Sequence, residues 1–203
     1  MNKGDFFLIL LLISFSYQQN ITLTIHTESL CPYCQQFFTT SFAPYLNTNL
    51  SLAEITIVPY GNAKKSSSSF LKPTITCQHG ENECYGNKIE LCILDTLGNT
   101  RKGHQYISCI EQFIFIFMKD FDRSTDYCIE DNNLRKTIKN CANSQKGLDL
   151  LNDSGNNKSS TVSYVPYILV NGVHNDDYED RILSNLTEFL ISENSKKRLY
   201  DSY

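Results

Sequence analysis

The feature that most constrains this fold is a pair of cysteines placed where a strand pattern meets a helix pattern. Residues 21–26 alternate apolar and polar side chains, which is typical of a half-buried β-strand. The chain then reaches Cys31-Pro32-Tyr33-Cys34, after which aromatic residues recur at helical spacing as far as Tyr45. Since proline is favourable in the first turn of a helix, the two cysteines are predicted to lie at a helix N-terminus directly after a strand.

The segments that flank this helix predict the rest of a small sheet. Residues 52–58 form a second strand pattern closed by the turn residues 59–62, which gives a parallel βαβ unit. Further on, residues 165–170 predict a buried strand, Asn171-Gly172 a tight hairpin turn, and residues 182–190 an amphipathic closing helix. We therefore expect one α/β domain over residues 20–203, in the order βαβ, helical insertion, ββα.

The insertion is predicted from about residue 64 to residue 160. One helical face runs from Tyr106 to Phe117 and another from Leu134 to Cys141, and polar segments at 64–69 and 152–160 predict surface loops. Six cysteines lie inside this region, an even number that predicts three structural disulfides stapling the insertion, with the pairing left open. They are Cys77, Cys84, Cys92, Cys109, Cys128 and Cys141.

The first residues predict a cleaved signal peptide. Lys3 precedes an apolar run from Phe6 to Phe15, and Ser14-Phe15-Ser16 has the small-x-small form that signal peptidase accepts. About ten apolar residues is half of what a membrane-spanning helix needs, so we expect no stable membrane insertion. The prediction is a signal peptide over residues 1–16, cleavage between 16 and 20, and a mature protein in the secretory pathway.

Composition agrees with that compartment. Eight cysteines suit oxidising surroundings, and N-x-S/T sequons make Asn49, Asn152, Asn157 and Asn185 glycosylation candidates. The net charge of −4, without a long basic run, predicts no nucleic-acid partner, because such binding needs clustered Lys and Arg.

Cysteines three residues apart in a first helical turn can close and reopen a small disulfide ring. Unpaired N–H groups at the helix start favour thiolate, so Cys31 is predicted to be the nucleophile and Cys34 the resolving thiol. We expect a pKa below about 6 for Cys31. The competing interpretations are a zinc half-site and a permanent bridge; Cys77-x-His79 with Cys84 lacks the usual zinc spacing, so no metal is predicted.

Three other residues carry open alternatives. Pro166 either presents the backbone to a substrate, if its peptide bond is cis, or merely opens a strand. His26 either lowers the pKa of Cys31 or faces solvent from the first strand. His79 is interpreted as held by hydrogen bonds within a disulfide-rich loop, the alternative being a proton donor near the site. His104 and His174 have no suggestive neighbours in the sequence.

A long motif from Cys77 to Cys92, CQHGENECYGNKIELC, points to a known family. It resembles the signature CQHGxxECxxNxxxxC of the gamma-interferon-inducible lysosomal thiol reductase family. The segments 28–34, 58–63, 164–166 and 170–172 resemble the same family in the same order, so the similarity covers nearly the whole mature chain. Two departures are His26-Thr27, where many members have aromatic residues, and the absence of a cysteine after Cys141.

This resemblance implies a thioredoxin-like fold with a disulfide-stapled helical insertion. It also implies a thiol–disulfide oxidoreductase that reduces disulfides of protein substrates in endosomal, lysosomal or extracellular space. The redox pair carries over onto Cys31 and Cys34, and the substrate-positioning role onto Pro166 and Val165. No prosthetic group is implied; a small thiol such as cysteine or glutathione would recharge the pair, and we expect a monomer. The alternatives are a secretory-pathway disulfide oxidase or isomerase, and a non-catalytic secreted cysteine-rich binding protein.

Overall fold

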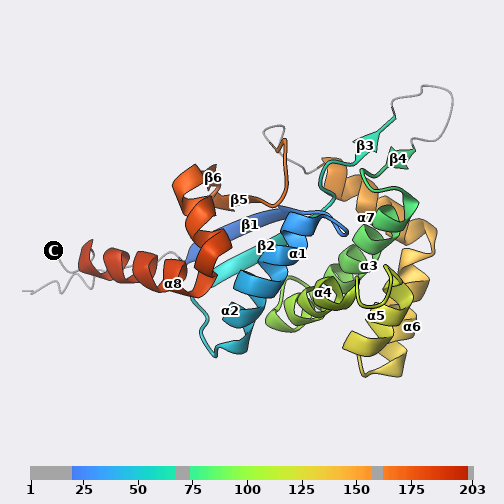
Figure 1. Cartoon of the computed structure of the whole chain (residues 1–203), viewed down its shortest axis with the longest axis horizontal. Helices are drawn as coiled ribbons and strands as arrows, with labels where there is room; N and C mark the ends of the chain where they lie inside the picture. Colours follow the sequence, from blue (N-terminus) through green and yellow to red (C-terminus); the bar gives the residue numbers. More distant parts are fainter. Residues whose placement is uncertain (1–19, 67–73, 157–161, 201–203) are drawn as a thin grey trace, which may run out of the picture.

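The computed structural model describes residues 20–66, 74–156 and 162–200. The predicted signal peptide and the sequon at Asn157 lie outside the described residues. A four-stranded sheet in the order β2-β1-β5-β6 forms the centre of the molecule (Figure 1). Strand β1 (Ile21–Thr27) pairs in parallel with β2 (Ala53–Pro59) and antiparallel with β5 (Tyr167–Val170), which turns back into β6 (Val173–His174).

The strands and the hairpin that the sequence predicts are found in the central sheet, and the predicted helix follows Cys31. The helix after Cys31 consists of α1 (Pro32–Phe37), the π-helical turn η1 (Phe38–Phe42) and α2 (Ala43–Asn47), and it connects β1 to β2 as the βαβ pattern predicts. Both turn residues between β5 and β6 have positive φ, 51° at Asn171 and 80° at Gly172, which is the requirement of a tight hairpin turn.

The closing helix α8 (Asp176–Tyr200) contains a break that the sequence pattern does not predict. Asn185 has non-helical angles (φ −158°, ψ 92°), which separates two helical parts. Ser41 from η1 fills the break: its hydroxyl donates to the Ile182 carbonyl at 2.5 Å and accepts from the Leu186 N–H at 2.8 Å. The buried backbone groups released by the break are therefore satisfied by a side chain from another helix.

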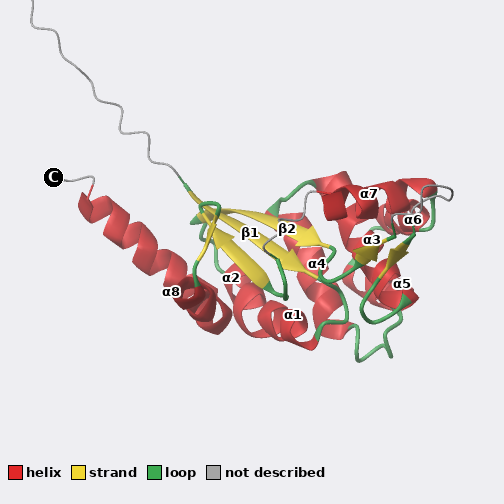
Figure 2. Cartoon of the chain, turned by 90° about the horizontal axis from the view of Figure 1, so that it is seen from above, coloured by secondary structure: helices red, strands yellow, loops and turns green. Residues whose placement is uncertain are grey.

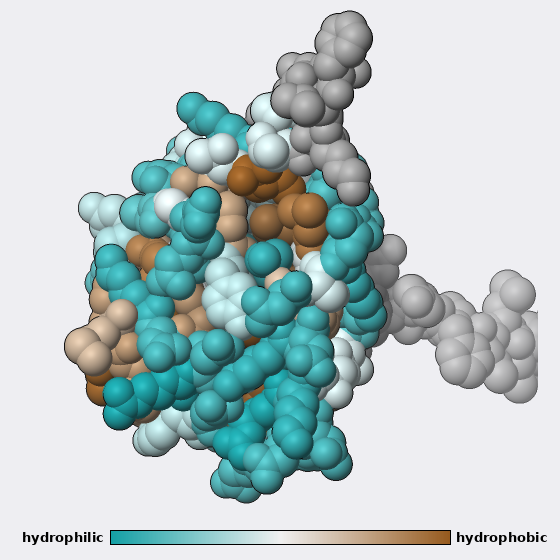
Figure 3. Space-filling model, turned by 90° about the vertical axis from the view of Figure 1, so that its right-hand side faces the viewer, coloured by the Kyte–Doolittle hydropathy of each residue, from teal (hydrophilic) through white to brown (hydrophobic). Residues whose placement is uncertain are grey.

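Helices α3 to α7 lie between β2 and β5 in the chain. They are α3 (Glu81–Leu97), α4 (Arg101–Phe113), α5 (Phe121–Cys128), α6 (Asn132–Ala142) and α7 (Gln145–Asn156). Figures 1 and 2 show α3, α5, α6 and α7 gathered toward one end of the sheet, and α8 at the opposite side; α4 runs back beside α2. Figure 3 faces this helical side, whose surface is mainly hydrophilic with separate apolar patches. The signal-peptide boundary and the extent of the insertion stay predictions.

Three disulfides join the six cysteines of this region. Cys77–Cys84 closes the loop before α3 onto its first turn, Cys92–Cys141 joins α3 to α6, and Cys109–Cys128 joins α4 to α5. The longest of these loops spans 49 residues. The cross-links therefore tie α3 to α6 and α4 to α5.

Both predicted polar loops are partly regular structure. Lys64–Lys65 is a short strand, β3, paired with β4 (Ile75–Thr76), and α7 continues to Asn156 where a loop from residue 152 is predicted. Packing overrides the polar composition of α7: the Ser154 hydroxyl donates to the Pro59 carbonyl at 2.9 Å, and a Cβ atom at Gly155 would overlap the Tyr60 ring.

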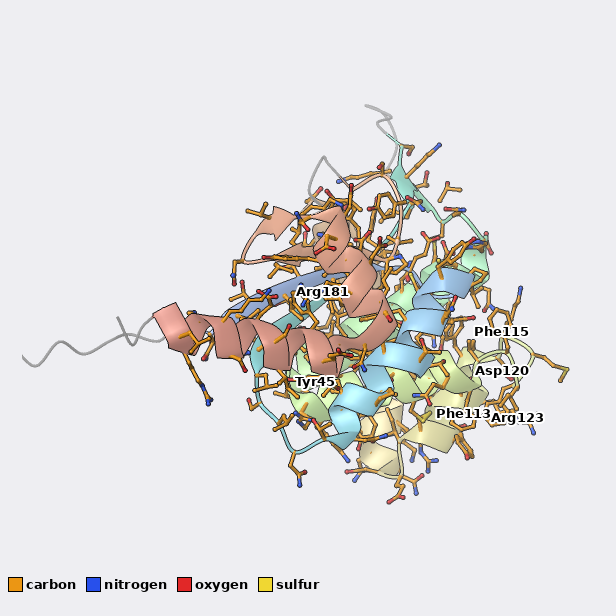
Figure 4. All side chains as sticks on the ribbon, turned by 60° about the vertical axis from the view of Figure 1, so that its left-hand side comes forward. Tyr45, Phe113, Phe115, Asp120, Arg123 and Arg181 are labelled. Atoms are coloured by element: carbon orange, nitrogen blue, oxygen red, sulfur yellow. A yellow bond between two sulfur atoms is a disulfide. The ribbon has the colours of Figure 1, made fainter. Side chains whose placement is uncertain are left out.

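The prediction that Phe117 continues the face of α4 is wrong, because α4 ends at Phe113. Phe117 instead packs on Tyr127, with ring centroids 5.3 Å apart, and beneath the Arg123 guanidinium at 4.9 Å. Asp120 then begins α5 by accepting a hydrogen bond from the Arg123 N–H at 2.9 Å. Figure 4 shows Phe113, Asp120 and Arg123 together at this turn.

The main core is formed by the apolar faces of β1, β2 and β5 and of the helices α1 to α6 and α8, with side chains that are mostly fully buried. The alternation of β1 is visible in it, since Ile21, Leu23 and Ile25 are buried while Thr22 is exposed. No helix within residues 20–66, 74–156 and 162–200 combines the length and apolarity needed to cross a membrane.

Candidate active site

Cys31 and Cys34 lie at the start of α1, as the sequence predicts. Cys31 is the N-cap residue, Pro32 is the first helical residue, and the Cys31 carbonyl accepts from the Gln35 N–H at 3.0 Å. The two thiols are not joined in a disulfide, and both side chains are buried, with 5 % of Cys31 and none of Cys34 exposed. The first turn of the helix thus holds one thiol near the surface and one behind it.

The electrostatics of the two thiols are opposite. A hydrogen bond from the Cys34 thiol is the largest influence on Cys31 and outweighs burial; with the N–H groups of Cys34 and Tyr33 and the charge of His79, it lowers the pKa of Cys31 to about 6. Burial raises the pKa of Cys34 well above its ordinary value. Cys31 is therefore the thiol that ionises near neutral pH.

A tight turn connects β1 to the nucleophile. The Cys31 N–H donates to the Glu28 carbonyl at 3.4 Å, and Leu30, although not glycine, has φ 71°. This left-handed conformation is disfavoured for a branched side chain and needs support from its surroundings. Ser29 supplies that support, because its N–H donates to Asn87 Oδ1 at 2.9 Å and its hydroxyl to the Glu83 carbonyl at 3.0 Å.

The side chain of Glu28 lies under this turn, 1 % exposed. Its Oε2 accepts from the Asn62 N–H at 2.7 Å, and its Oε1 lies 3.6 Å from His79 Nδ1. The same His79 nitrogen contacts the Glu83 carboxylate. Burial is the main cause that raises the pKa of Glu28 to about 7; the hydrogen bond from Asn62 lowers it, and the charges of Glu83 and Cys31 act in the same direction as burial.

Gly61 permits this position of Glu28. Its φ is 56°, and a Cβ atom there would overlap the Glu28 carboxylate. Gly86 plays the matching part on α3, since a Cβ atom at Gly86 would overlap the Ser29 hydroxyl and the Phe121 ring. Both glycines are needed for close approach, and Gly61 also for its left-handed backbone conformation.

The Cys77–Cys92 motif therefore forms a wall of the site in addition to carrying cysteines of the disulfides. His79 contacts both Glu28 and Glu83, and Asn87 holds the turn at Ser29. Gln78 accepts from the Asn62 side chain at 2.8 Å. The predicted hydrogen-bonded His79 is found, with 34 % of its side chain exposed. Sequence reasoning missed Glu28, Gly61, Glu83 and Asn87 as site residues, although all four lie within the segments that resemble the family.

Val165 and Pro166 come from the opposite end of the chain. The peptide bond between them is cis, and the Val165 carbonyl lies 3.7 Å from Cys31 Sγ. Val165 packs with Cys31 and Cys34 in a small buried cluster that also contains Tyr167. The structure thus brings together the redox pair and the segment predicted to position a substrate.

The remaining histidines differ from expectation. His26 is only 3 % exposed and lies 6.4 Å from the Tyr167 ring, so the solvent-facing alternative is wrong. His174, for which the sequence offers no neighbours, stacks on Tyr167 at 4.1 Å and contacts Asp176 at 2.9 Å. His174 therefore packs against β5, the strand that follows Pro166.

Two further carboxyl groups, Glu90 on α3 and Glu111 on α4, are buried behind the site. They are 0 % and 1 % exposed, and burial raises the pKa of each, to about 7 for Glu90 and well above the ordinary value for Glu111. The charge of Cys31 raises the pKa of Glu111 further.

Among the described residues, Glu28, His79 and Glu83 form a group that could hold a metal ion, with ligand atoms within 4.8 Å of one another.

Of the glycosylation candidates, Asn49 and Asn185 are exposed, and Asn152 is half-buried in α7.

A thiol of lowered pKa beside a buried second thiol defines a dithiol–disulfide redox site. Residues 22–145 match the family described as gamma interferon inducible lysosomal thiol reductase. The chain is 31 % identical over 175 residues to the Gamma-interferon-inducible lysosomal thiol reductase of Carassius auratus, covering 85 % of this chain and 68 % of the relative. It is 29 % identical over 187 residues to the Gamma-interferon-responsive lysosomal thiol protein of Arabidopsis thaliana, covering 87 % and 75 %. It is 31 % identical over 180 residues to GILT-like protein 1 of Drosophila melanogaster, covering 82 % and 72 %. The chain belongs to the gamma interferon inducible lysosomal thiol reductase family.

Proposed function

We propose that this protein is a thiol–disulfide oxidoreductase that reduces disulfide bonds of protein substrates. The observation that carries the proposal is the opposite electrostatics of the two thiols: the pKa of Cys31 is lowered to about 6 and that of Cys34 is raised. Near neutral pH such a pair holds a thiolate ready to attack and a protonated thiol in reserve.

The reaction then has two exchanges. The Cys31 thiolate attacks one sulfur of the substrate disulfide, the other substrate sulfur leaves, and Cys31 is joined to the substrate in a mixed disulfide. Cys34 attacks Cys31 Sγ, which releases the second substrate thiol and leaves Cys31 and Cys34 oxidised. Val165 and Pro166 position the substrate chain, because the Val165 carbonyl lies beside Cys31 Sγ at 3.7 Å.

We place the enzyme in the lysosome or in the extracellular space reached by the secretory pathway, and its direction as reduction. The relatives' names, lysosomal thiol reductases, support both choices. A small thiol such as cysteine or glutathione recharges the oxidised pair, and the protein acts as a monomer. A strongly oxidising potential of the Cys31–Cys34 couple would instead favour an oxidase.

We also propose that the sheet region has a thioredoxin-like fold. Its support is the parallel pairing of β1 with β2 across α1, the antiparallel pairing of β1 with β5, and the helix α8 that follows β6.

The decisive experiment measures reduction of a disulfide-linked protein at about pH 5 and pH 7 by the mature chain, Cys31→Ser and Cys34→Ser. We expect activity in the native chain, none in Cys31→Ser, and a trapped mixed disulfide in Cys34→Ser. Activity that survives Cys31→Ser would refute the proposal.

A further inference from the structure

Both ring nitrogens of His174, on β6, face groups that accept hydrogen bonds. Nδ1 lies 3.1 Å from the Ile168 carbonyl oxygen, and Nε2 lies 2.9 Å from a carboxylate oxygen of Asp176. A carbonyl and an ionised carboxylate only accept, and a neutral imidazole carries a proton on one nitrogen alone. Both contacts are therefore hydrogen bonds at the same time only when the ring is protonated and positively charged.

The surroundings of the ring also favour that charge. The titratable groups that face it are Asp176 and Glu179 of α8, Tyr164 and Tyr167 of the segment around β5 and, next to Tyr167, His26 of β1. The Glu179 carboxylate, of a residue that is 6 % exposed, lies 3.6 Å from Nδ1. Burial lowers the pKa of His174, but the hydrogen bonds to Ile168 and Asp176 and the charge of Glu179 outweigh burial and raise it.

His174 connects the two residues that flank the Val165–Pro166 segment. Tyr164 precedes the segment and Tyr167 follows it. The Tyr167 ring stacks on the His174 ring with centroids 4.1 Å apart, and the Tyr164 hydroxyl lies 3.2 Å from Nε2. Both ends of the segment that faces the nucleophile therefore contact one histidine.

Loss of the histidine proton changes these contacts. In the structure the Tyr164 hydroxyl donates to Glu179 Oε1 at 2.6 Å, and the Ile168 N–H donates to Glu179 Oε2 at 2.8 Å. A neutral ring without a proton on Nε2 turns a lone pair toward Asp176 and competes with Glu179 for the Tyr164 hydroxyl. A neutral ring without a proton on Nδ1 turns a lone pair toward the Ile168 carbonyl. In either form one hydrogen bond donated by the ring is lost.

We propose that His174 is a positioning residue for the reaction: its charged ring holds the Val165–Pro166 segment where a substrate chain binds, and reduction of protein disulfides weakens as this charge is lost. This inference rests on the proposed function. The histidine charge is lost as the pH rises, whereas the Cys31 thiolate forms as the pH rises through its pKa of about 6. The two requirements therefore limit activity from opposite sides of the pH profile.

The test measures single turnovers of the reduced, full mature chain with insulin as the disulfide-linked probe, from about pH 5 to about pH 9. The variant is His174→Gln, which keeps a polar side chain without a charge. We expect it to be at least about threefold slower than the native enzyme near pH 6, the effect of one lost hydrogen bond, and equal to it near pH 9. Alkylation of Cys31 by iodoacetamide, which needs no bound chain, should have the same pH profile in both proteins.

Asp176→Asn and Asp177→Asn form a matched pair in the first turn of α8. The Asp176 side chain is 93 % exposed, and its charge supports that of His174, so Asp176→Asn should move the alkaline fall in activity downward by a few tenths of a pH unit. The Asp177 side chain is 77 % exposed and lies 3.9 Å from Arg181, so Asp177→Asn should leave the profile unchanged. Since both acids are exposed, this pair tests the inference even if His174→Gln does not fold.

Three results would overturn the inference: an unchanged profile in His174→Gln, equal or absent shifts in the two aspartate variants, or a change in Cys31 alkylation as large as that in insulin reduction. The last result would place the effect on the thiol. The ring protons of His174 in NMR spectra of the native chain should also titrate above the ordinary histidine pKa of about 6.5, and a lower midpoint refutes the charged ring. If the native chain reduces insulin at no pH, the proposed function fails, and this titration still decides the charge of His174.

Discussion

Gly61→Ala tests whether the turn after β2 is shaped by the buried carboxylate of Glu28. An alanine at φ 56° costs about 1–2 kcal/mol from backbone strain alone. Its Cβ atom would also lie only 2.7 Å from Glu28 Cδ, so the carboxylate must move away from the Asn62 N–H, which it now accepts at 2.7 Å. Loss of that buried, charge-assisted hydrogen bond adds about 1.5–3 kcal/mol. We therefore expect a total loss of about 2.5–5 kcal/mol in the free energy of unfolding.

Gly172→Ala is the matched control for Gly61→Ala. It carries the same kind of backbone strain, at φ 80°, but a Cβ atom there meets no atom within 4 Å. Its cost should remain at about 1–2 kcal/mol. Urea denaturation of both variants measures the difference, and iodoacetamide alkylation against pH reports whether Cys31 is disturbed. Equal destabilisation by the two substitutions would refute the role given to Glu28 at Gly61.

Three further predictions follow from the site and its cross-links. Alkylation of Cys31 should be half-maximal near pH 6, and Cys34→Ala should move that midpoint upward, because it removes the main hydrogen bond to the thiolate; an unchanged midpoint would contradict this origin. The pKa of Cys31 in the folded protein, about 6, lies below that of an unfolded thiol, about 8.5. Ionisation of Cys31 therefore stabilises the reduced fold at high pH, and this stabilisation is lost as the pH falls through about 6. Asn87→Ala should lower the free energy of unfolding in urea by about 1–3 kcal/mol, because the buried Ser29 N–H loses its acceptor. A loss below about 1 kcal/mol would show that another group accepts from this N–H. The double variant Cys92→Ser/Cys141→Ser should lose about 2–5 kcal/mol in the same assay, and a native midpoint would show that the 49-residue loop needs no cross-link.

The sequence predicts those parts of the site that are set by neighbours along the chain. The strand, the cysteine pair and the helix after it follow from periodicity and from Pro32, because these patterns act within a few residues. The hairpin at Asn171-Gly172 is local in the same sense.

The site residues that the sequence does not predict depend on contacts between distant segments. Glu28 meets Asn62 across 34 positions, and Ser29 meets Asn87 across 58. Neither contact leaves a periodic signal, and the sequence alone does not show which polar residues become buried. The loop predicted from residue 152 is wrong for residues 152–156 for a related reason, since packing against Pro59 and Tyr60 outweighs their polar composition and keeps them helical.

The Cys77–Cys84 disulfide limits how strong a reductant this enzyme can work with. The bridge closes the loop that carries His79, so the group beside Glu28 is held in place by a bond of the same kind that the enzyme breaks. A reductant strong enough to recharge Cys31 and Cys34 must be too weak, or too slow, to open Cys77–Cys84. The difference in reduction potential between these two cysteine pairs sets the upper limit of reducing strength at which the enzyme keeps its own site intact.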